Sequence, residues 1–398
     1  MNKAVATAAS SGAAIIAARV LGPGGRGQLA LEVTLVTLAM GLLATSVAIA
    51  GRLHLVGDDP TSPDHYFGLG AVVVVLQTGV CAVIALVLLP LAGVPRSSAL
   101  VLGPMLFGAV LVAAYISTNA LYAYGRFVQA GILDSGSSVV TLVASVGLLA
   151  ADVRTVSWYL AAFTAGSLAE LLAGVWFHRR NNLRIRPRVD RAAWRTLLRT
   201  GVPATGLGVA QSATYRLDRY LVGLFLTPSF VGVYAVAGTI TELLRLVPFA
   251  VSQVLLHRVA ANLLTERFQQ RVHTLTVALT ALEITLLGLL APVIVPAVFG
   301  RAYLGAVTPL RILLVGELAV SSFLIDSSTL MGRRRPGAAA QAAVLALVVV
   351  TALDLALIPA FQLAGAAWAS VVGYWAMATL ARYRVRHGRE VPSQQAAP

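Results

Sequence analysis

Long apolar stretches alternate with short polar connections along the whole chain. Twelve runs of about 20 mostly apolar residues can be delimited, long enough to cross a hydrocarbon core of roughly 30 Å as helices. In the first half they cover residues 4–20, 28–50, 67–89, 99–121, 129–150 and 156–177. In the second half they cover residues 201–226, 231–256, 272–299, 308–331, 337–358 and 363–381. The pattern predicts an all-α polytopic membrane protein with about twelve transmembrane helices.

The composition excludes a soluble domain. Of the 398 residues, 58% are apolar and 12% are charged, whereas soluble domains carry about 25% charged residues. The single cysteine, Cys81, cannot form an intramolecular disulfide, and the six histidines lack ligand spacing. We therefore predict no cofactor and no metal site.

The basic residues predict the orientation. If the spans alternate from a cytoplasmic N-terminus, 21 of the 30 basic residues fall on the cytoplasmic side and five fall outside. This asymmetry follows the positive-inside rule and predicts that both termini are cytoplasmic. The net charge of +14 then reflects short loops that face an anionic leaflet, so we expect no nucleic-acid partner.

The longest polar segment divides the twelve spans six and six. It predicts an N-terminal lobe of residues 1–178, a basic cytoplasmic linker of residues 179–199, a C-terminal lobe of residues 200–384 and a polar cytoplasmic tail of residues 385–398. The linker is also compatible with an amphipathic helix on the membrane surface, whose Trp194, Leu197 and Leu198 would face lipid.

The two halves share a short pattern at the same place. At an offset of 205 residues, five positions are identical: Leu21/Leu226, Pro23/Pro228, Gly27/Gly232, Ala30/Ala235 and Thr34/Thr239. Each stretch joins the first span of its half to the second. Because six spans restore the orientation, such repeats are parallel, and transporters built from repeats bind their substrate between them.

Two nucleotide-binding motifs can be set aside. Residues 22–27 match GxGxxG, but a membrane span precedes them and no acidic residue follows at the required distance. GxxxxGK[ST] is absent, so the sequence predicts no ATP hydrolysis by a P-loop. Any driving force would come from an ion gradient, the membrane potential or the substrate gradient.

Ionisable residues inside the spans are the main chemical signal. Insertion of each such side chain into a bilayer costs free energy, so it normally faces the interior of a helix bundle or a water-filled cavity. The seventh span carries Arg216, Asp218 and Arg219, and the eighth carries Glu242 and Arg245. They form either internal charge pairs, Glu242 with Arg245 and Asp218 with Arg219 or a neighbour, or a cationic cavity wall that grips a phosphate. Other acids, including Glu32 and Asp354, are scattered singly, and one of them would be needed for proton or sodium coupling.

Several stretches in order resemble bacterial polysaccharide and O-antigen flippases, the polysaccharide transporter family of the multidrug/oligosaccharidyl-lipid/polysaccharide exporter superfamily. They are ARVLGPGGRGQLA at residues 18–30, RLDRYLVG at 216–223, VGVYAVA at 231–237, FGRAY at 299–303, PLRILL at 309–314, and LIP and GAA at 357–359 and 365–367. The resemblance covers nearly the whole chain.

This resemblance implies two six-helix lobes, as in MATE-type transporters, around a central cavity in the bacterial cytoplasmic (inner) membrane. It implies alternating-access transfer of a polyprenyl-diphosphate-linked oligosaccharide to the outer leaflet, for O-antigen lipopolysaccharide or another cell-envelope polysaccharide. The candidate substrate-binding residues are Arg19, Arg216, Arg219 and Arg245, and the candidate ion-coupling or charge-pairing residues are Glu32, Asp218 and Glu242.

Partners would be the lipid-linked oligosaccharide, the lipid bilayer, H⁺ or Na⁺, and glycan-assembly membrane proteins. A cation-coupled multidrug exporter, a peptidoglycan-precursor flippase and a membrane glycosyltransferase or polymerase are the alternatives. The glycosyltransferase or polymerase is disfavoured because every predicted outer loop is short, so we expect no enzyme.

Overall fold

The computed structural model describes residues 2–55, 63–95, 97–181, 187–261 and 263–387, and these residues form helices and short connections. The first half contains α1 (Asn2–His54), α2 (Pro63–Val83), the π-helical turn η1 (Ile84–Leu88), α3 (Leu89–Leu91), α4 (Ser98–Ala123), α5 (Phe127–Ala150) and α6 (Val156–Arg180). The second half contains α7 (Arg191–Thr214), α8 (Leu217–Phe225), α9 (Pro228–Leu244), α10 (Leu246–Ala260), α11 (Glu266–Phe299), the 3₁₀ helix η2 (Arg301–Ala306), α12 (Val307–Gly332) and α13 (Pro336–His387). The all-α prediction is confirmed for the described residues.

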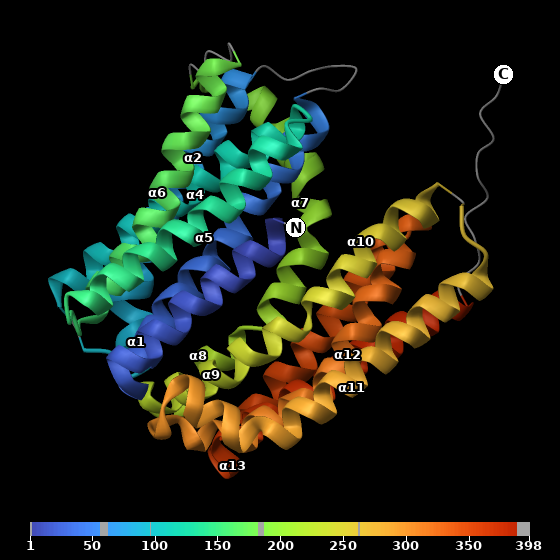
Figure 1. Cartoon of the computed structure of the whole chain (residues 1–398). Coiled ribbons are helices and arrows are strands. Elements are labelled where there is room, and N and C mark those ends of the chain that lie inside the picture. Colours follow the sequence, from blue (N-terminus) through green and yellow to red (C-terminus); the bar gives the residue numbers. More distant parts are fainter. Residues whose placement is uncertain (1, 56–62, 96, 182–186, 262, 388–398) are drawn as a thin grey trace.

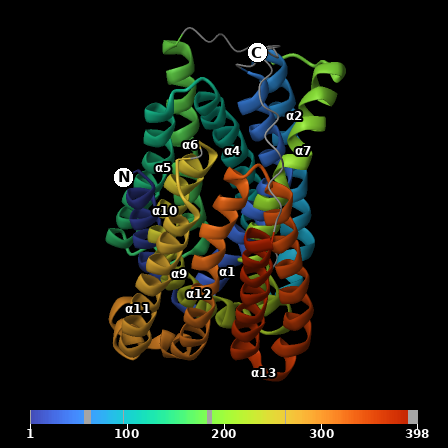
Figure 2. The same cartoon turned by 90° about the vertical axis from the view of Figure 1, so that its right-hand side faces the viewer.

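The two longest helices each double back on themselves. Helix α1 reverses at Gly22, whose φ of 66° is open to glycine and strained for most other residues, and Pro23 restarts the helix. Helix α13 reverses at Gln362, with φ 49°. A Cβ on Gly365 would meet the carbonyl of Leu357, so the two arms of α13 lie side by side (Figure 2). Each of these helices therefore accounts for two crossings.

Two further crossings are interrupted. Helices α7 and α8 are separated by a break at Arg216, and α9 and α10 are bent by 42° at Arg245. Eight described helices are long and apolar enough to span a membrane, or nine if the bent pair is one span. Counting α1 and α13 twice and joining α7 to α8 gives twelve crossings in the described chain, in agreement with the twelve predicted spans.

Part of the segment between the halves is helical, because α6 ends at Arg180 and α7 begins at Arg191. Asp190 caps α7 by accepting a hydrogen bond from the Ala192 backbone at 2.8 Å, so residues 191–199 form the first turns of α7. Leu197 is fully buried, and the Trp194 indole donates to the His65 carbonyl at 3.1 Å. Leu197 and Trp194 therefore pack against the protein, contrary to the surface-helix interpretation, whereas Leu198 is 38% exposed. Residues 182–186 of the linker and 388–398 of the tail lie outside the described residues.

The helices gather into two lobes, α1–α6 and α7–α13 (Figure 1). Apolar side chains cover their outer surface, for example Val75 on α2, Leu102 on α4 and Leu289 on α11, which are 71%, 65% and 70% exposed. Such a surface suits lipid and not water. The chain is therefore a multi-pass membrane protein, while the lobe boundaries at residues 178 and 200 stay predictions.

The lobes meet through the pattern that repeats along the sequence. A Cβ on Gly27 would lie 1.6 Å from the Pro228 carbonyl oxygen, and a Cβ on Gly232 would lie 1.9 Å from the Pro23 carbonyl oxygen. The two contacts are reciprocal: each pairs a glycine of one half with the proline of the other half, at positions equivalent under the offset of 205 residues. Reciprocal contacts of this kind are typical of an isologous two-fold interface. The reciprocity is what duplicated lobes would produce, and only glycine lets the two backbones approach so closely.

The lobes share a broad apolar core at one end, while at the other end the start of α7 stays packed against α1 and α2 of the first lobe. A large apolar cluster links α1 of the first lobe with α9, α11, η2 and α12 of the second, and it includes Leu31, Tyr234 and Phe299. In Figure 1 the two groups of ribbons lie together at the end that carries the α1 reversal and diverge toward the end that carries the α6–α7 and α12–α13 connections. This second end is the basic one, with Arg179, Arg180 and residues 333–335.

Candidate functional site

The in-span charges of the second lobe converge where its first two crossings are broken. Tyr215 and Arg216 interrupt α7 and α8, and Arg216 has a non-helical φ of −136°. Arg245 sits at the bend between α9 and α10. Asp218, Arg219, Glu242 and Arg245 line one small cavity of about 10 Å³, together with Tyr215, Tyr234 and Tyr374. A space of that size holds about one water, so the cluster is tightly packed, although the Glu242 side chain is 40% exposed.

Arg245 is neutralised by an acid from another helix. Its Nε and Nη2 donate to the two carboxylate oxygens of Glu317 on α12 at 2.8 and 2.6 Å, and the Glu317 side chain is 2% exposed. The guanidinium also lies over the Tyr215 ring at 4.2 Å and near the Tyr374 ring at 5.9 Å. The pairing of Arg245 with Glu242, one of the two alternatives drawn from the sequence, is not found, because the bend turns Arg245 toward α12.

Arg219 takes Glu242 as its partner instead. Its Nη2 donates to Glu242 Oε1 at 2.7 Å. Gly238 makes room for this contact, since a Cβ there would lie 2.7 Å from the same Nη2. Of the two partners considered for Asp218, Arg219 or a neighbour, the structure shows neighbours, because the Arg219 guanidinium is bound to Glu242 and reaches Asp218 only through its backbone N–H.

Asp218 belongs to a second buried group. Its carboxylate accepts hydrogen bonds from the Tyr234 hydroxyl at 2.8 Å, the Ser370 hydroxyl at 3.3 Å and its neighbour's backbone N–H at 2.7 Å. Asp354, on the first arm of α13, lies within electrostatic range of Asp218 and is fully buried, and both of its carboxylate oxygens lack a hydrogen-bond partner. A buried carboxylate in that state calls for a proton or a cation.

Arg216 is left over from these pairings. Its guanidinium lies within electrostatic range of Glu242, Arg219 and Arg245. Among the described residues it makes no hydrogen bond and no ion pair. Glu242 is already bound to Arg219, and the Asp218 carboxylate, which is also within electrostatic range, is held by the Tyr234 and Ser370 hydroxyls. A free guanidinium at a helix break is therefore available to an anion.

The candidate residues of the first lobe lie elsewhere. Arg19, before the α1 reversal, donates through Nε to the Val298 carbonyl at 2.6 Å and through Nη2 to the Ala297 carbonyl. These are orphan carbonyls at the C-terminus of α11, where a cation is favoured. Arg19 therefore bridges the lobes at their joined end and is not part of the arginine cluster. Glu32 is fully buried, accepts from Gln28 at 3.0 Å through Oε1, and has no partner for Oε2.

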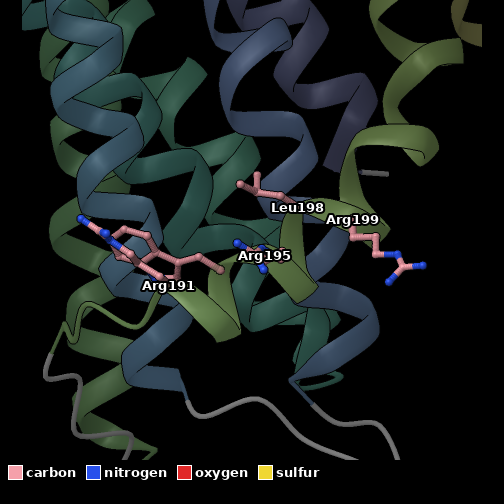
Figure 3. A pocket seen from close by; sticks show the side chains of 5 residues that line it. Arg191, Arg195, Leu198 and Arg199 are labelled. Atoms are coloured by element: carbon pink, nitrogen blue, oxygen red, sulfur yellow. The ribbon is translucent and has the colours of Figure 1, made fainter.

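A further basic feature lies at the start of α7. Arg191, Arg195 and Arg199, with Trp194 and Leu198, surround an open hollow of about 570 Å³ (Figure 3). Figure 3 shows Arg199 extending away from Arg191 and Arg195, so the three do not converge on one point. The feature fits an anchor for anionic lipid at the membrane surface better than an enclosed site.

Sequence reasoning missed Glu317, Tyr215 and Tyr374 as members of the cluster. Glu317 was recognisable as an in-span acid, but nothing local ties it to Arg245, 72 residues earlier. The two tyrosines carry no signal that separates them from ordinary core residues.

Residues 8–256 match the family model of polysaccharide biosynthesis proteins. The match covers more than half of the chain, so the chain belongs to this family. No curated protein matches.

Solved structures with the same fold are transporters of the MOP superfamily. An inward-facing multidrug-resistance MATE transporter is 16% identical, covers 96% of this chain and 94% of its own, and superposes with a TM-score of 0.73. The lipid II flippase MurJ in an inward closed conformation is 13% identical. The alignment covers 97% of this chain and 86% of MurJ, with a TM-score of 0.77. An outward-facing MATE transporter is 15% identical. The alignment covers 97% of this chain and 96% of that transporter, with a TM-score of 0.55. At these identities the likeness shows the fold alone, the two-lobed helical architecture.

Proposed function

We propose that this chain is a flippase that moves a polyprenyl-diphosphate-linked oligosaccharide, a precursor of cell-surface polysaccharide, from the inner to the outer leaflet of the bacterial cytoplasmic membrane. The observation that carries the proposal is the match of residues 8–256 to the polysaccharide biosynthesis family on a two-lobed transporter fold. The protein acts as a transporter and catalyses no chemical step. Glycan-assembly membrane proteins would supply and receive the substrate.

The arrangement of the lobes supports an inward-open starting state. The lobes diverge at the end with the basic loops, which the positive-inside rule assigns to the cytoplasm along with both termini (Figure 1). The other end is closed by the glycine crossing and by Arg19 on α11. Alternating access then requires the outer contacts to open as the inner ends approach each other.

The arginine cluster supports a phosphate-bearing substrate. Arg216 is the member without an acid, and its neighbours Arg219 and Arg245 could exchange their carboxylates for phosphate oxygens when the lobes move. Guanidinium groups grip phosphate through paired hydrogen bonds. The diphosphate would lie at this cluster while the polyprenyl tail stays in the bilayer.

The test is the sidedness of a fluorescent polyprenyl-diphosphate oligosaccharide in proteoliposomes. We expect protein-dependent flipping in the wild type, a strong loss in Arg216→Ala, and wild-type flipping in Arg301→Ala, a control that removes an exposed arginine at the outer end. No flipping by folded wild type, across several glycans and with pH or sodium gradients imposed, would overturn the function. Full activity in Arg216→Ala would remove only Arg216 from the substrate site.

We also propose that H⁺ or Na⁺ binds at Asp218 and Asp354. The support is the pair of buried carboxylates, one of them without any hydrogen-bond partner, beside the Tyr234 and Ser370 hydroxyls. Asp354→Asn should make flipping independent of the imposed gradient. Gradient dependence equal to that of the wild type in this variant would contradict the assignment.

A cation-coupled multidrug exporter is the second candidate. The observation that favours it is Glu32, a fully buried acid in the first lobe with an unpartnered oxygen, which could serve as a proton site. Proton-driven efflux of ethidium that Glu32→Gln abolishes, with no glycan flipping, would support it. A peptidoglycan-precursor flippase would instead prefer lipid II over other lipid-linked glycans in the same proteoliposomes.

A further inference from the structure

One arginine of the first lobe has no role in the pairings described above. Arg26 lies on α1, one turn after the reversal at Gly22, where α1 meets the second lobe. It is only 8% exposed. Its Nε is buried without a partner, and Arg26 makes no hydrogen bond or ion pair within the described chain. A guanidinium in this position is a buried cation without a counterion.

The surroundings of Arg26 do not supply that counterion. It lies within electrostatic range of Arg219, Glu242 and Tyr303. Glu242 is already bound to Arg219 at 2.7 Å, and the Tyr303 hydroxyl donates to the Ala18 carbonyl at 2.8 Å. Arg219 repels Arg26. Among the described residues, the acid within electrostatic range of Arg26 is Glu242, which is already bound to Arg219 of the opposite lobe.

The internal repeat shows what the fold itself requires at this position. The reciprocal contacts of Gly27 and Gly232 fix the alignment of the two lobes at an offset of 205 residues. The equivalent of Arg26 is then Val231, which is 0% exposed and packs in the central apolar cluster. The same place in the duplicated architecture is filled by an apolar side chain, so packing does not require a charge there.

Burying an unpaired charge destabilises a protein, and replacing it by an apolar residue of suitable size is often neutral or favourable. The charge of Arg26 thus disfavours the closed state, in which the described residues provide no ion-pair partner for it. This is expected for a side chain that binds an anion only when the outer end of the lobes is open. Separation of the lobes at their joined end would expose Arg26 beside Arg219, on the side of the cluster nearer to the α1 reversal.

We propose that Arg26 is a substrate-binding residue that receives the phosphate group of the lipid-linked substrate when the outer end opens. The inference rests on the proposed flippase function and adds a residue to it. Arg216 of the second lobe would take the phosphate in the inward-open state, and Arg26 of the first lobe would take it in the outward-open state. Release of the Arg219–Glu242 pair would then be compensated by phosphate held between Arg26 and Arg219.

The experiment measures flipping rates against substrate concentration in proteoliposomes for wild type, Arg26→Val, Arg26→Lys and Arg301→Val. Arg26→Val copies the residue of the second repeat, and Arg301→Val removes an exposed charge at the same end. We expect Arg26→Val to lower the maximal rate by roughly tenfold or more, the loss of one charge-assisted hydrogen bond. The substrate concentration at half-maximal rate should change little, because binding from the inside does not use Arg26.

Arg26→Lys should recover part of the rate, and Arg301→Val should behave as wild type. In detergent, Arg26→Val should unfold at a temperature equal to or above that of the wild type. Wild-type rates in Arg26→Val would overturn the inference and leave the flippase function intact. A lower unfolding temperature of Arg26→Val would also overturn it, because Arg26 would then be structural. Absence of flipping in the wild type itself would instead refute the proposed function.

Discussion

At the scale of single residues, the arginines of the second lobe are neutralised by acids that lie far from them in the sequence, Arg219 by Glu242 and Arg245 by Glu317. Arg216, Arg219 and Arg245 stood out because charges are rare in membrane spans, and the structure brings all three together. The spacing rule that paired Glu242 with Arg245 assumes a continuous helix. The helix is broken at Arg245, so the rule fails there, and the true partner is 72 residues away. No local pattern encodes such a contact.

The Arg245–Glu317 pair gives the first prediction. Glu317→Ala leaves a largely buried guanidinium without its acid, and removal of one member of a buried pair costs about 3–5 kcal/mol. We expect a clear fall in the unfolding temperature in detergent. The matched control is Glu266→Ala, which removes an acid that is 74% exposed and 3.3 Å from Arg333, and should cost less than about 1 kcal/mol.

Glu317→Leu combined with Arg245→Met should recover most of that loss, because no unpaired charge remains. An equal response of Glu317→Ala and Glu266→Ala would contradict the view that the buried pair holds α10 against α12.

At the scale of elements, hydropathy predicted the crossings and missed their breaks. A window of about 20 apolar residues reports length, and it gives the same result for a straight helix and for one interrupted at Arg216 or bent at Arg245. The reversals were easier, because Gly22 with Pro23 is a recognisable turn. The break at Gln362 falls between the predicted spans of residues 337–358 and 363–381, although Gln362 itself is an unusual residue for a positive φ.

The crossing of α1 and α9 gives the second prediction. Gly27→Ala places a methyl group on the Pro228 carbonyl, so the two helices must move apart, and overpacking of this kind typically costs about 1–3 kcal/mol. Gly232→Ala should cost a similar amount, because the contact is reciprocal. Thermal unfolding of the purified variants in detergent measures both.

Gly208→Ala is the control for this pair. It also changes a helical glycine, but no atom lies within 4 Å of the added Cβ, so the variant should be neutral or stabilised by about 0.5–1 kcal/mol. Unfolding temperatures that are the same in Gly27→Ala and Gly208→Ala would show that the close backbone approach does not contribute to stability.

At the scale of the whole molecule, the duplicated architecture was predictable and the conformation was not. Five identities at a constant offset, together with the six-and-six division, indicated two parallel repeats. In the structure, the repeated positions Gly27 and Gly232 contact each other's halves at the end where the lobes share their apolar core. Which end is joined depends on small differences between two packings of the same helices, and no sequence pattern reports such differences.

The closed outer end gives the third prediction. A Cβ on Gly24 would lie 3.4 Å from the Ser229 hydroxyl of the opposite lobe. Gly24→Cys with Ser229→Cys, in a Cys81→Ser background, should therefore form a disulfide that fixes the lobes together at this end. If alternating access requires that end to open, oxidation should abolish flipping in proteoliposomes, and reduction should restore it. Each single-cysteine variant should flip before and after oxidation. Undiminished flipping by a fully cross-linked pair would mean that the substrate crosses without separation of the lobes there, and the rocking mechanism would have to be abandoned.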